Sequence, residues 1–279
     1  MRWRVAGGRR RRQRSRRARE LAAAAGDELE AKHESFVFVH GPLPADRCVE
    51  LIEASLARSR RPSPDALAGL GFALTMMGRV DEARARFEDA LLLANEIGAE
   101  WSIVSIHMYR GAALLMMDED VEAEAELRAA AEALRAMGER SMRSTAAALL
   151  AEALYRQGRY EEAMEASVES EGATASDDLA SAMAWRGVRA KLLAKEGNLS
   201  EARRLAEEAV SIAGETDLVN MTADAHMDLA VVLRAAGDIG GAAAQTEIAA
   251  KLLEAKGNTT ALARVEALRR SFLAEIPVT

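Results

Sequence analysis

The chain has 279 residues, of which 49% are hydrophobic and 4% aromatic, and it carries a net charge of −7. This alanine-rich composition argues against a β-sandwich, which needs short alternating runs of β-branched and aromatic residues. The single cysteine, Cys48, excludes an internal disulfide, and no apolar run reaches the 18 or so residues of a membrane-spanning helix. We therefore expect an all-α, cytoplasmic protein with no membrane partner, in which Cys48 is an apolar helix residue.

Residues 1–20 form a basic tail. They contain ten Arg and one Glu, a charge of +9, so the rest of the chain carries −16. Three interpretations are open: a solvated, disordered arm, a tail that binds nucleic acid through its phosphates, or sequence that precedes the true start of the domain. Disorder is our expectation for this tail, and it is the only part of the chain that we consider for nucleic-acid binding.

The rest, residues 21–279, is predicted to be one helical domain that starts with an irregular helix pair over 21–60. Helical runs cover 20–40 and 45–59, on either side of the turn Gly41-Pro42-Leu43-Pro44. A terminal repeat is often atypical because one of its faces meets solvent.

A phrase of seven residues recurs five times between residues 64 and 257. It reads MGRVDEA, MDEDVEA, QGRYEEA, EGNLSEA and AGDIGGA, with a period of about 40, and it closes on Ala83, Ala123, Ala163, Ala202 and Ala242. Runs with helical periodicity precede and follow each phrase, so each repeat is predicted to be a helix pair. The glycine in the phrase, replaced by Asp118 in the second copy, suits the left-handed conformation that ends a helix.

Further glycines mark the end of the second helix, which is expected at Gly98, Gly138 and Gly257, with Gly172 and Gly214 nearby in the copies where the offset shifts. Helices of about 17 residues joined by short turns pack as antiparallel pairs. One pair cannot cover both of its apolar faces, so the pairs must stack, which predicts a right-handed α-solenoid. Residues 259–275 then read as a C-terminal capping helix.

The alanine that opens each second helix, followed by a large and then a small residue, resembles the tetratricopeptide repeat. Ala83, Phe87 and Ala90 show this spacing in the first copy. That family usually has a period of 34 residues, whereas HEAT and armadillo repeats have periods near 40. The position of the glycine phrase between the two helices favours the tetratricopeptide interpretation, with helices that are longer by nearly a turn.

Solenoids bind extended partners along the concave face that their first helices line. The repeat register places six candidate partner-binding residues on that face: Glu152, Tyr155, Arg156, Lys191, Lys195 and Arg234. Their mostly positive charge, in an acidic body, favours an acidic peptide or protein segment as the partner.

The sequence carries none of the strongest catalytic signatures. It has no GxxxxGK[ST] phosphate loop, no HExxH and no CxxC, and its four histidines are far apart. The acidic triplet Asp118-Glu119-Asp120 has too few ligands for calcium and is interpreted as a solvated turn. We therefore expect no enzyme activity, no cofactor and no metal site.

Two segments, 138–163 and 182–210, are similar to a more specific group of proteins. They resemble the C-terminal tetratricopeptide region of large bacterial regulatory proteins in which an adenylate/guanylate cyclase domain precedes an AAA-type ATPase domain. The run WRGVRAK, residues 185–191, is the most specific part, and GPLPAD, residues 41–46, resembles the linker of that region. The motifs of the two enzyme domains are absent here.

The resemblance implies a non-catalytic interaction or scaffold module with a regulatory role in signalling or transcription. Two alternatives stay open. In the first alternative, the chain is a detached C-terminal part of a cyclase/AAA ATPase whose enzyme domains lie elsewhere. In the second, it is an adaptor that associates with nucleic acid through its Arg-rich tail.

Overall fold

The computed structural model describes residues 37–59 and 62–274, and this part of the chain is helical with no strand. The basic tail and most of the first predicted helix lie outside these residues. Residues 37–40 are helical. The helices that follow are α3 (Ala45–Arg58), α4 (Pro64–Met76), α5 (Val80–Glu96), α6 (Glu100–Met116), α7 (Asp120–Ala136), α8 (Ser141–Arg156), α9 (Tyr160–Ala173), α10 (Leu179–Lys195), α11 (Leu199–Ala213), α12 (Val219–Ala235), α13 (Ile239–Lys256) and α14 (Thr259–Ala274). The all-α prediction is confirmed.

The turn inside each repeat forms at the predicted residue. Gly78, Gly158, Gly197 and Gly237 have φ between +73° and +82°, and Asp118 takes the same left-handed conformation with φ +60°. The turn also satisfies carbonyl groups at the end of the helix, since the amide of Arg79 donates to Leu74 O at 3.0 Å. The seven-residue phrase is therefore the C-terminal cap of one helix and the first turn of the next.

The second set of glycines lies at or near the ends of the second helices, but in two different conformations. Gly98, Gly138 and Gly257 are left-handed, with φ between +66° and +70°. Gly172 instead lies inside α9, which ends where Thr174 turns extended, and Gly214 ends α11 with φ −60°. Gly214 thus stands at the end of its helix and Gly172 two residues before the C-cap of α9, as expected, but the connections after α9 and α11 contain no left-handed residue.

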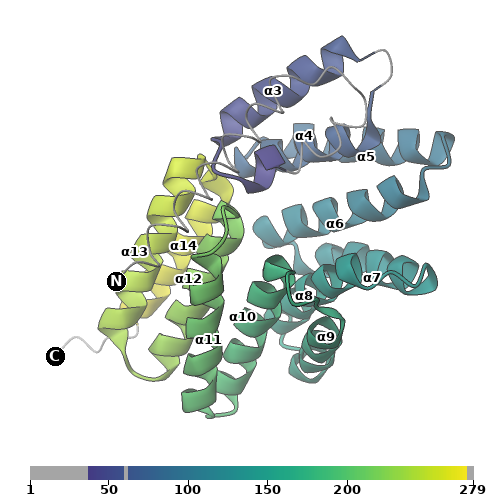
Figure 1. Cartoon of the computed structure of the whole chain (residues 1–279). Coiled ribbons are helices and arrows are strands. Elements are labelled where there is room, and N and C mark those ends of the chain that lie inside the picture. The colour runs from purple at the N-terminus through teal and green to yellow at the C-terminus, as the bar shows by residue number, and fades with distance from the viewer. Residues whose placement is uncertain (1–36, 60–61, 275–279) are drawn as a thin grey trace, which may run out of the picture.

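The helices pack as successive pairs that stack into a superhelix (Figure 1). The first helices of the repeats, α4, α6, α8, α10 and α12, contact one another in sequence, and we call the layer that they form the inner layer. Small residues allow the two helices of a pair to pack closely, since a β-carbon on Gly111 of α6 would lie 2.6 Å from Leu127 Cγ of α7. Burying a side chain such as Leu127 stabilises the fold by roughly 1.5 to 3 kcal/mol.

The two ends of the described chain are fastened to each other. Lys256, at the end of α13, is 1% exposed, and its Nζ donates to the carbonyl oxygens of Phe38, Gly41 and Leu43 at 3.0, 2.8 and 2.6 Å. The hydroxyl of Thr260 in α14 donates to Thr75 O of α4 at 2.6 Å. The superhelix therefore turns far enough to bring its last repeat against its first.

Candidate functional site

Charged side chains from several repeats meet on the inner layer. We call them the inner charge cluster, and it consists of Asp118, Asp120, Glu152, Arg156, Lys191, Asp224, Asp228 and Arg264. They come from the α6–α7 turn, the start of α7, and helices α8, α10, α12 and α14. Side chains that are distant in sequence meet here because the first helices lie side by side.

Lys191 lies at the centre of the cluster. It is 4% exposed, and its Nζ lies 2.5 Å from Glu152 Oε2 and 2.6 Å from Asp228 Oδ1, with the ring of Tyr155 at 4.7 Å. Burial opposes protonation of the amine, but Asp228 and Glu152 outweigh that effect and raise the pKa of Lys191 above its usual range. The ammonium group is therefore charged and fully engaged within the fold.

The two carboxylates that hold Lys191 are in different electrostatic environments. Burial opposes ionisation of Glu152, but Lys191 and Arg156 outweigh it and hold its pKa below the usual range. Burial raises the pKa of Asp228 to about 6, although Lys191 partly offsets the effect. As the pH falls, Asp228 therefore protonates before Glu152, and Glu152 keeps its ion pair with Lys191 to lower pH.

A glycine makes room for Asp228. A β-carbon built on Gly187, one turn before Lys191 in α10, would lie 2.1 Å from Asp228 Oδ2. A glycine inside a helix costs about 1 kcal/mol relative to alanine. The close approach of the carboxylate to the backbone of α10 accounts for a residue that helix propensity disfavours.

Arg156 and Arg264 link the cluster to the α6–α7 turn. Arg156 Nη1 donates to Leu115 O at 2.7 Å and lies 3.6 Å from both Asp118 Oδ1 and Asp120 Oδ1. Arg264 Nε of α14 lies 3.0 Å from Asp118 Oδ1. The acidic triplet is thus more than a solvated turn, although Asp118 itself is 65% exposed.

Asp224 and Asp118 are the two exposed carboxylates of the cluster, and Asp224 has no partner among its members. It makes no hydrogen bond or ion pair with the part of the chain that the structure describes, yet burial by the surrounding protein raises its pKa. Together, the eight residues provide five carboxylates against three cations. The cluster therefore carries an excess of negative charge when every member is ionised.

The structure brings four of the six sequence-predicted residues together, namely Glu152, Tyr155, Arg156 and Lys191. Lys195 is exposed near them, with its Nζ 5.7 Å from the ring centre of Tyr160. Arg234 lies apart, and its guanidinium is 6.0 Å from the ring centre of Phe272 in α14. No ligand marks any of the six, so their role as partner-binding residues stays a prediction.

Sequence reasoning missed the acidic half of the cluster. Asp224 and Asp228 were not among the candidates, nor was Arg264, because each joins the cluster only through the stacking of the repeats. One signal was available, since Gly187 interrupts a run of good helix formers, and an isolated helical glycine indicates a close approach by another group.

The other polar features belong to the framework. His107 Nδ1 lies 2.6 Å from Glu126 Oε2, and His226 Nδ1 lies 2.6 Å from Gln245 Oε1, so both histidines join the two helices of their own pair. The buried Cys48 thiol donates to Phe38 O at 3.0 Å. Across 37–59 and 62–274, no three His, Cys, Asp or Glu side chains are grouped to hold a metal, and none of the described helices has the length and apolar character to cross a membrane.

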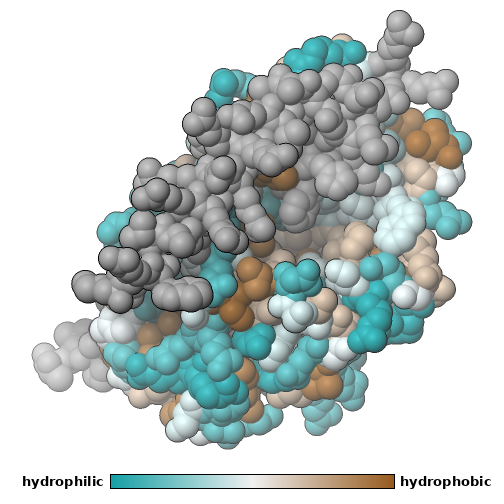
Figure 2. Space-filling view, in the orientation of Figure 1, coloured by the Kyte–Doolittle hydropathy of each residue, from teal (hydrophilic) through white to brown (hydrophobic). Residues whose placement is uncertain are grey.

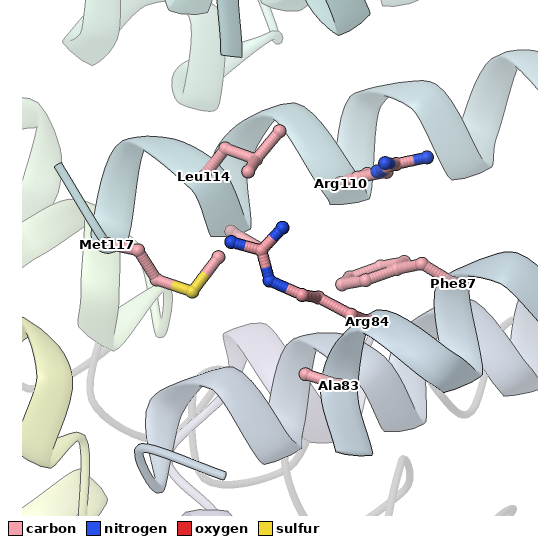
Figure 3. A pocket seen from close by; sticks show the side chains of 7 residues that line it. Ala83, Arg84, Phe87, Arg110, Leu114 and Met117 are labelled. Atoms are coloured by element: carbon pink, nitrogen blue, oxygen red, sulfur yellow. The ribbon is translucent and has the colours of Figure 1, made fainter. Parts of the chain in front are cut away.

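A small pocket between α5 and α6 offers no ligand site. Figure 3 shows Arg84 reaching from α5 toward Leu114 of α6 and Met117, which follows that helix. The space is about 10 Å³, barely enough for one water, and the guanidinium of Arg84 is held by both oxygens of Glu119 at 2.7 Å. The described surface in Figure 2 is mostly hydrophilic with separated hydrophobic groups.

The fold and the repeat register define a helical-repeat solenoid, and comparisons with known proteins agree. The structure superposes on NprR in complex with its cognate peptide NprX with a TM-score of 0.65 at 15% identity, over 96% of this chain and 82% of that one. For the apo form of RapI the TM-score is 0.60 at 15% identity, with 86% and 89% covered. For a Rap protein complexed with competence and sporulation factor it is 0.56 at 15% identity, with 89% and 73% covered.

Residues 65–97, which span α4 and α5, match the family model of the tetratricopeptide repeat. The match covers one helix pair, and the other described pairs repeat the same antiparallel arrangement. No curated protein matches the sequence significantly. The likeness to NprR and the Rap proteins is one of fold.

Proposed function

We propose that the chain is a non-catalytic binding module that holds an extended peptide or protein segment on its inner layer and thereby regulates a partner. The observation that carries the proposal is the inner charge cluster, in which charged groups from successive repeats converge on one face. A solenoid uses this face for extended partners. NprR and one Rap protein, which share the fold, were crystallised with a peptide and with competence and sporulation factor, and this supports a peptide as the ligand class.

The acidic partner expected from the sequence remains part of the proposal, but its contact point changes. Lys191 and Arg156 already hold carboxylates of the protein itself, so neither is available to a partner. Lys195 is exposed beside them and forms no ion pair in the described structure. An acidic segment would therefore bind at Lys195 and avoid the negative excess around Asp224.

Selection of peptides against the full chain tests this proposal. Segments enriched from a random peptide library should lose about tenfold in affinity when Lys195→Glu reverses the charge, a change of about 1.4 kcal/mol. Lys251→Glu, at an exposed lysine of the second helix α13, is the matched control and should bind as the wild type does. The proposal is wrong if no peptide is enriched, or if both variants lose the same amount of peptide affinity, because the inner layer would then not be the binding site.

The proposed role is regulatory, as in the cyclase/AAA ATPase proteins that residues 138–163 and 182–210 resemble. That resemblance rests on the sequence alone, as do the two alternatives of a detached C-terminal part and a nucleic-acid-associated adaptor. Purified protein should neither hydrolyse ATP nor form a cyclic nucleotide. If the protein shifts the electrophoretic mobility of DNA or RNA in a salt-dependent way, and deletion of residues 1–20 abolishes this shift, the adaptor is favoured instead.

A further inference from the structure

A second candidate site lies on the side of α10 that faces the second helices α9 and α11. A groove of about 400 Å³ opens there, far larger than the pocket between α5 and α6. Its lining includes Trp185, Arg186 and Arg189 of α10, Glu171 of α9 and Glu208 of α11. We call it the outer groove, and it shares no residue with the inner charge cluster.

Trp185 and the two arginines are held firmly in the outer groove. Trp185 is 5% exposed, and the guanidinium carbons of Arg186 and Arg189 lie 4.1 and 4.7 Å from the centre of its ring. This cation–π packing is reinforced, since Arg186 Nη1 donates to Ala182 O at 3.0 Å and Arg189 Nε donates to Ser167 Oγ at 3.2 Å. Two positive groups are thus fixed before any ligand arrives.

Two hydrogen-bond donors of this assembly have no acceptor. The Nε1 of Trp185 and the Nη2 of Arg189 are buried, and neither donates a hydrogen bond within the described structure. Buried donors in folded proteins are almost always paired. Both donors belong to side chains that line the outer groove, so a ligand with acceptor atoms could supply their missing partners.

The present counter-ions show which chemistry the arginines accept. Glu171 Oε2 lies 2.5 Å from Arg189 Nη1, and Glu208 Oε2 lies 3.3 Å from Arg186 Nε. These glutamates are 49% and 42% exposed, whereas Arg189 and Arg186 are 14% and 23% exposed. An ion pair with an exposed partner is weak, so the glutamates can turn into solvent while the arginines keep their positions.

We propose that the outer groove binds a carboxylate side chain of an acidic protein segment. The carboxylate replaces Glu171 at the fork of Arg189 and Glu208 at Arg186, and it accepts hydrogen bonds from Arg189 Nη2 and from the indole of Trp185. Two bonds from one guanidinium fork to a carboxylate are directional as well as strong. The site is independent of the proposed function of the inner layer.

The indole N–H of Trp185 reports directly on this binding in a ¹⁵N-labelled sample of the full chain. Acetylated hexaglutamate is titrated in, with hexalysine and inorganic phosphate as separate probes, and Trp185→Phe assigns the resonance. We expect hexaglutamate to shift the Trp185 resonance in a saturable way. The indole of Trp101, which is 49% exposed on α6, should not move and serves as the internal reference.

Variants then test the arginine fork. Arg189→Gln should weaken hexaglutamate binding at least about tenfold, since a hydrogen bond to a charged group contributes about 1.5 to 3 kcal/mol. Arg189→Lys keeps the charge without the fork and should lose part of the affinity, which also covers the case in which Arg189→Gln fails to fold. Arg203→Gln, at an exposed arginine of α11 outside the groove, should bind as the wild type does.

The proposal is wrong if the Trp185 resonance stays fixed, or if both Arg189 variants bind hexaglutamate as the wild type does. It is also wrong if inorganic phosphate at the same concentration reproduces the shift and displaces the peptide, because the groove would then be a general anion site. Loss of inner-layer binding by Lys195→Glu has no bearing on these outcomes.

Discussion

Substitution of Gly187 by alanine should destabilise the protein even though alanine is the better helix former. The new β-carbon would lie 2.1 Å from Asp228 Oδ2, so the carboxylate must rotate away. The rotation breaks the contact between Asp228 Oδ1 and Lys191 Nζ, which is now 2.6 Å. Lys191 is then left with Glu152 alone inside the inner charge cluster.

The two opposing effects can be estimated separately. Replacing a helical glycine with alanine gains about 1 kcal/mol. Losing a hydrogen bond between charged groups costs about 1.5 to 3 kcal/mol. The net loss of unfolding free energy should therefore be about 0.5 to 2 kcal/mol, and a change of 1 kcal/mol moves the melting temperature of a chain of this size by about 2 to 4 °C.

The decisive assay is a double-mutant cycle with Asp228→Ala. In that background the clashing carboxylate is absent, and the nearest remaining atom, Cβ, lies 3.4 Å from the new methyl group, an ordinary contact. Gly187→Ala should then stabilise the protein by about 1 kcal/mol, so the effect changes sign. Urea denaturation followed by far-UV circular dichroism measures all four proteins, at a pH near 8 where Asp228, with its pKa of about 6, is ionised.

The reasoning is refuted if Gly187→Ala stabilises both backgrounds to the same extent. Asp228 would then either not approach α10 at Gly187 or contribute nothing through Lys191. Equal destabilisation in both backgrounds would point to a clash with another group, and the link between the glycine and the ion pair would fail as well.

Four other substitutions test the packing and the charges of the fold. Lys256→Met should lower the melting temperature by several degrees, because it leaves the buried carbonyls of Phe38, Gly41 and Leu43 without their donor. Amide hydrogen exchange should accelerate over residues 37–48 at milder conditions than in the middle repeats. The raised pKa of Asp228 means that the folded state binds this proton more tightly than the unfolded state does, so Asp228 makes the stability fall as the pH rises from about 4 to about 6. Asp228→Asn should remove this contribution to the dependence of the unfolding free energy on pH, as measured by denaturation across this range. Gly111→Ala should destabilise the fold, because its β-carbon would lie 2.6 Å from Leu127 Cγ. Gly240→Ala, with no neighbour within 4 Å, should stabilise the fold by up to about 1 kcal/mol. A higher melting temperature for Gly111→Ala than for Gly240→Ala would contradict the close contact between Gly111 and Leu127.

The fold was predictable from the sequence because every repeat carries the same local signal for the end of its first helix. A left-handed residue must end each first helix, and Gly78, Asp118 and Gly158 do so at the expected places. The ends of the second helices are less regular, since α9 and α11, near Gly172 and Gly214, end without a left-handed residue where the spacing of the repeats shifts. There the glycine is one way among several to leave a helix, and a residue type alone does not determine which is used.

The candidate site was predictable only within a repeat. Glu152, Tyr155 and Arg156 share a helix face, so their proximity follows from helical periodicity. The contact of Asp228 with Lys191 depends on how far one repeat rotates relative to the next. The contact of Arg264 with Asp118 depends in addition on the superhelix closing on itself, a property of the accumulated twist of the stack that no single repeat encodes.

One short run, WRGVRAK, serves two faces of α10. Successive residues of a helix are about 100° apart, so Trp185, Arg186 and Arg189 fall within one arc, while Gly187 and Lys191 lie on the opposite side. The first three line the outer groove and the other two complete the inner charge cluster. Because the two sets share a helix but no contacts, Arg189→Gln should leave intact the sign change that Gly187→Ala shows between the wild-type and Asp228→Ala backgrounds. Loss of that sign change would mean that the two faces of α10 are coupled, and the outer groove could not then be treated as a site of its own.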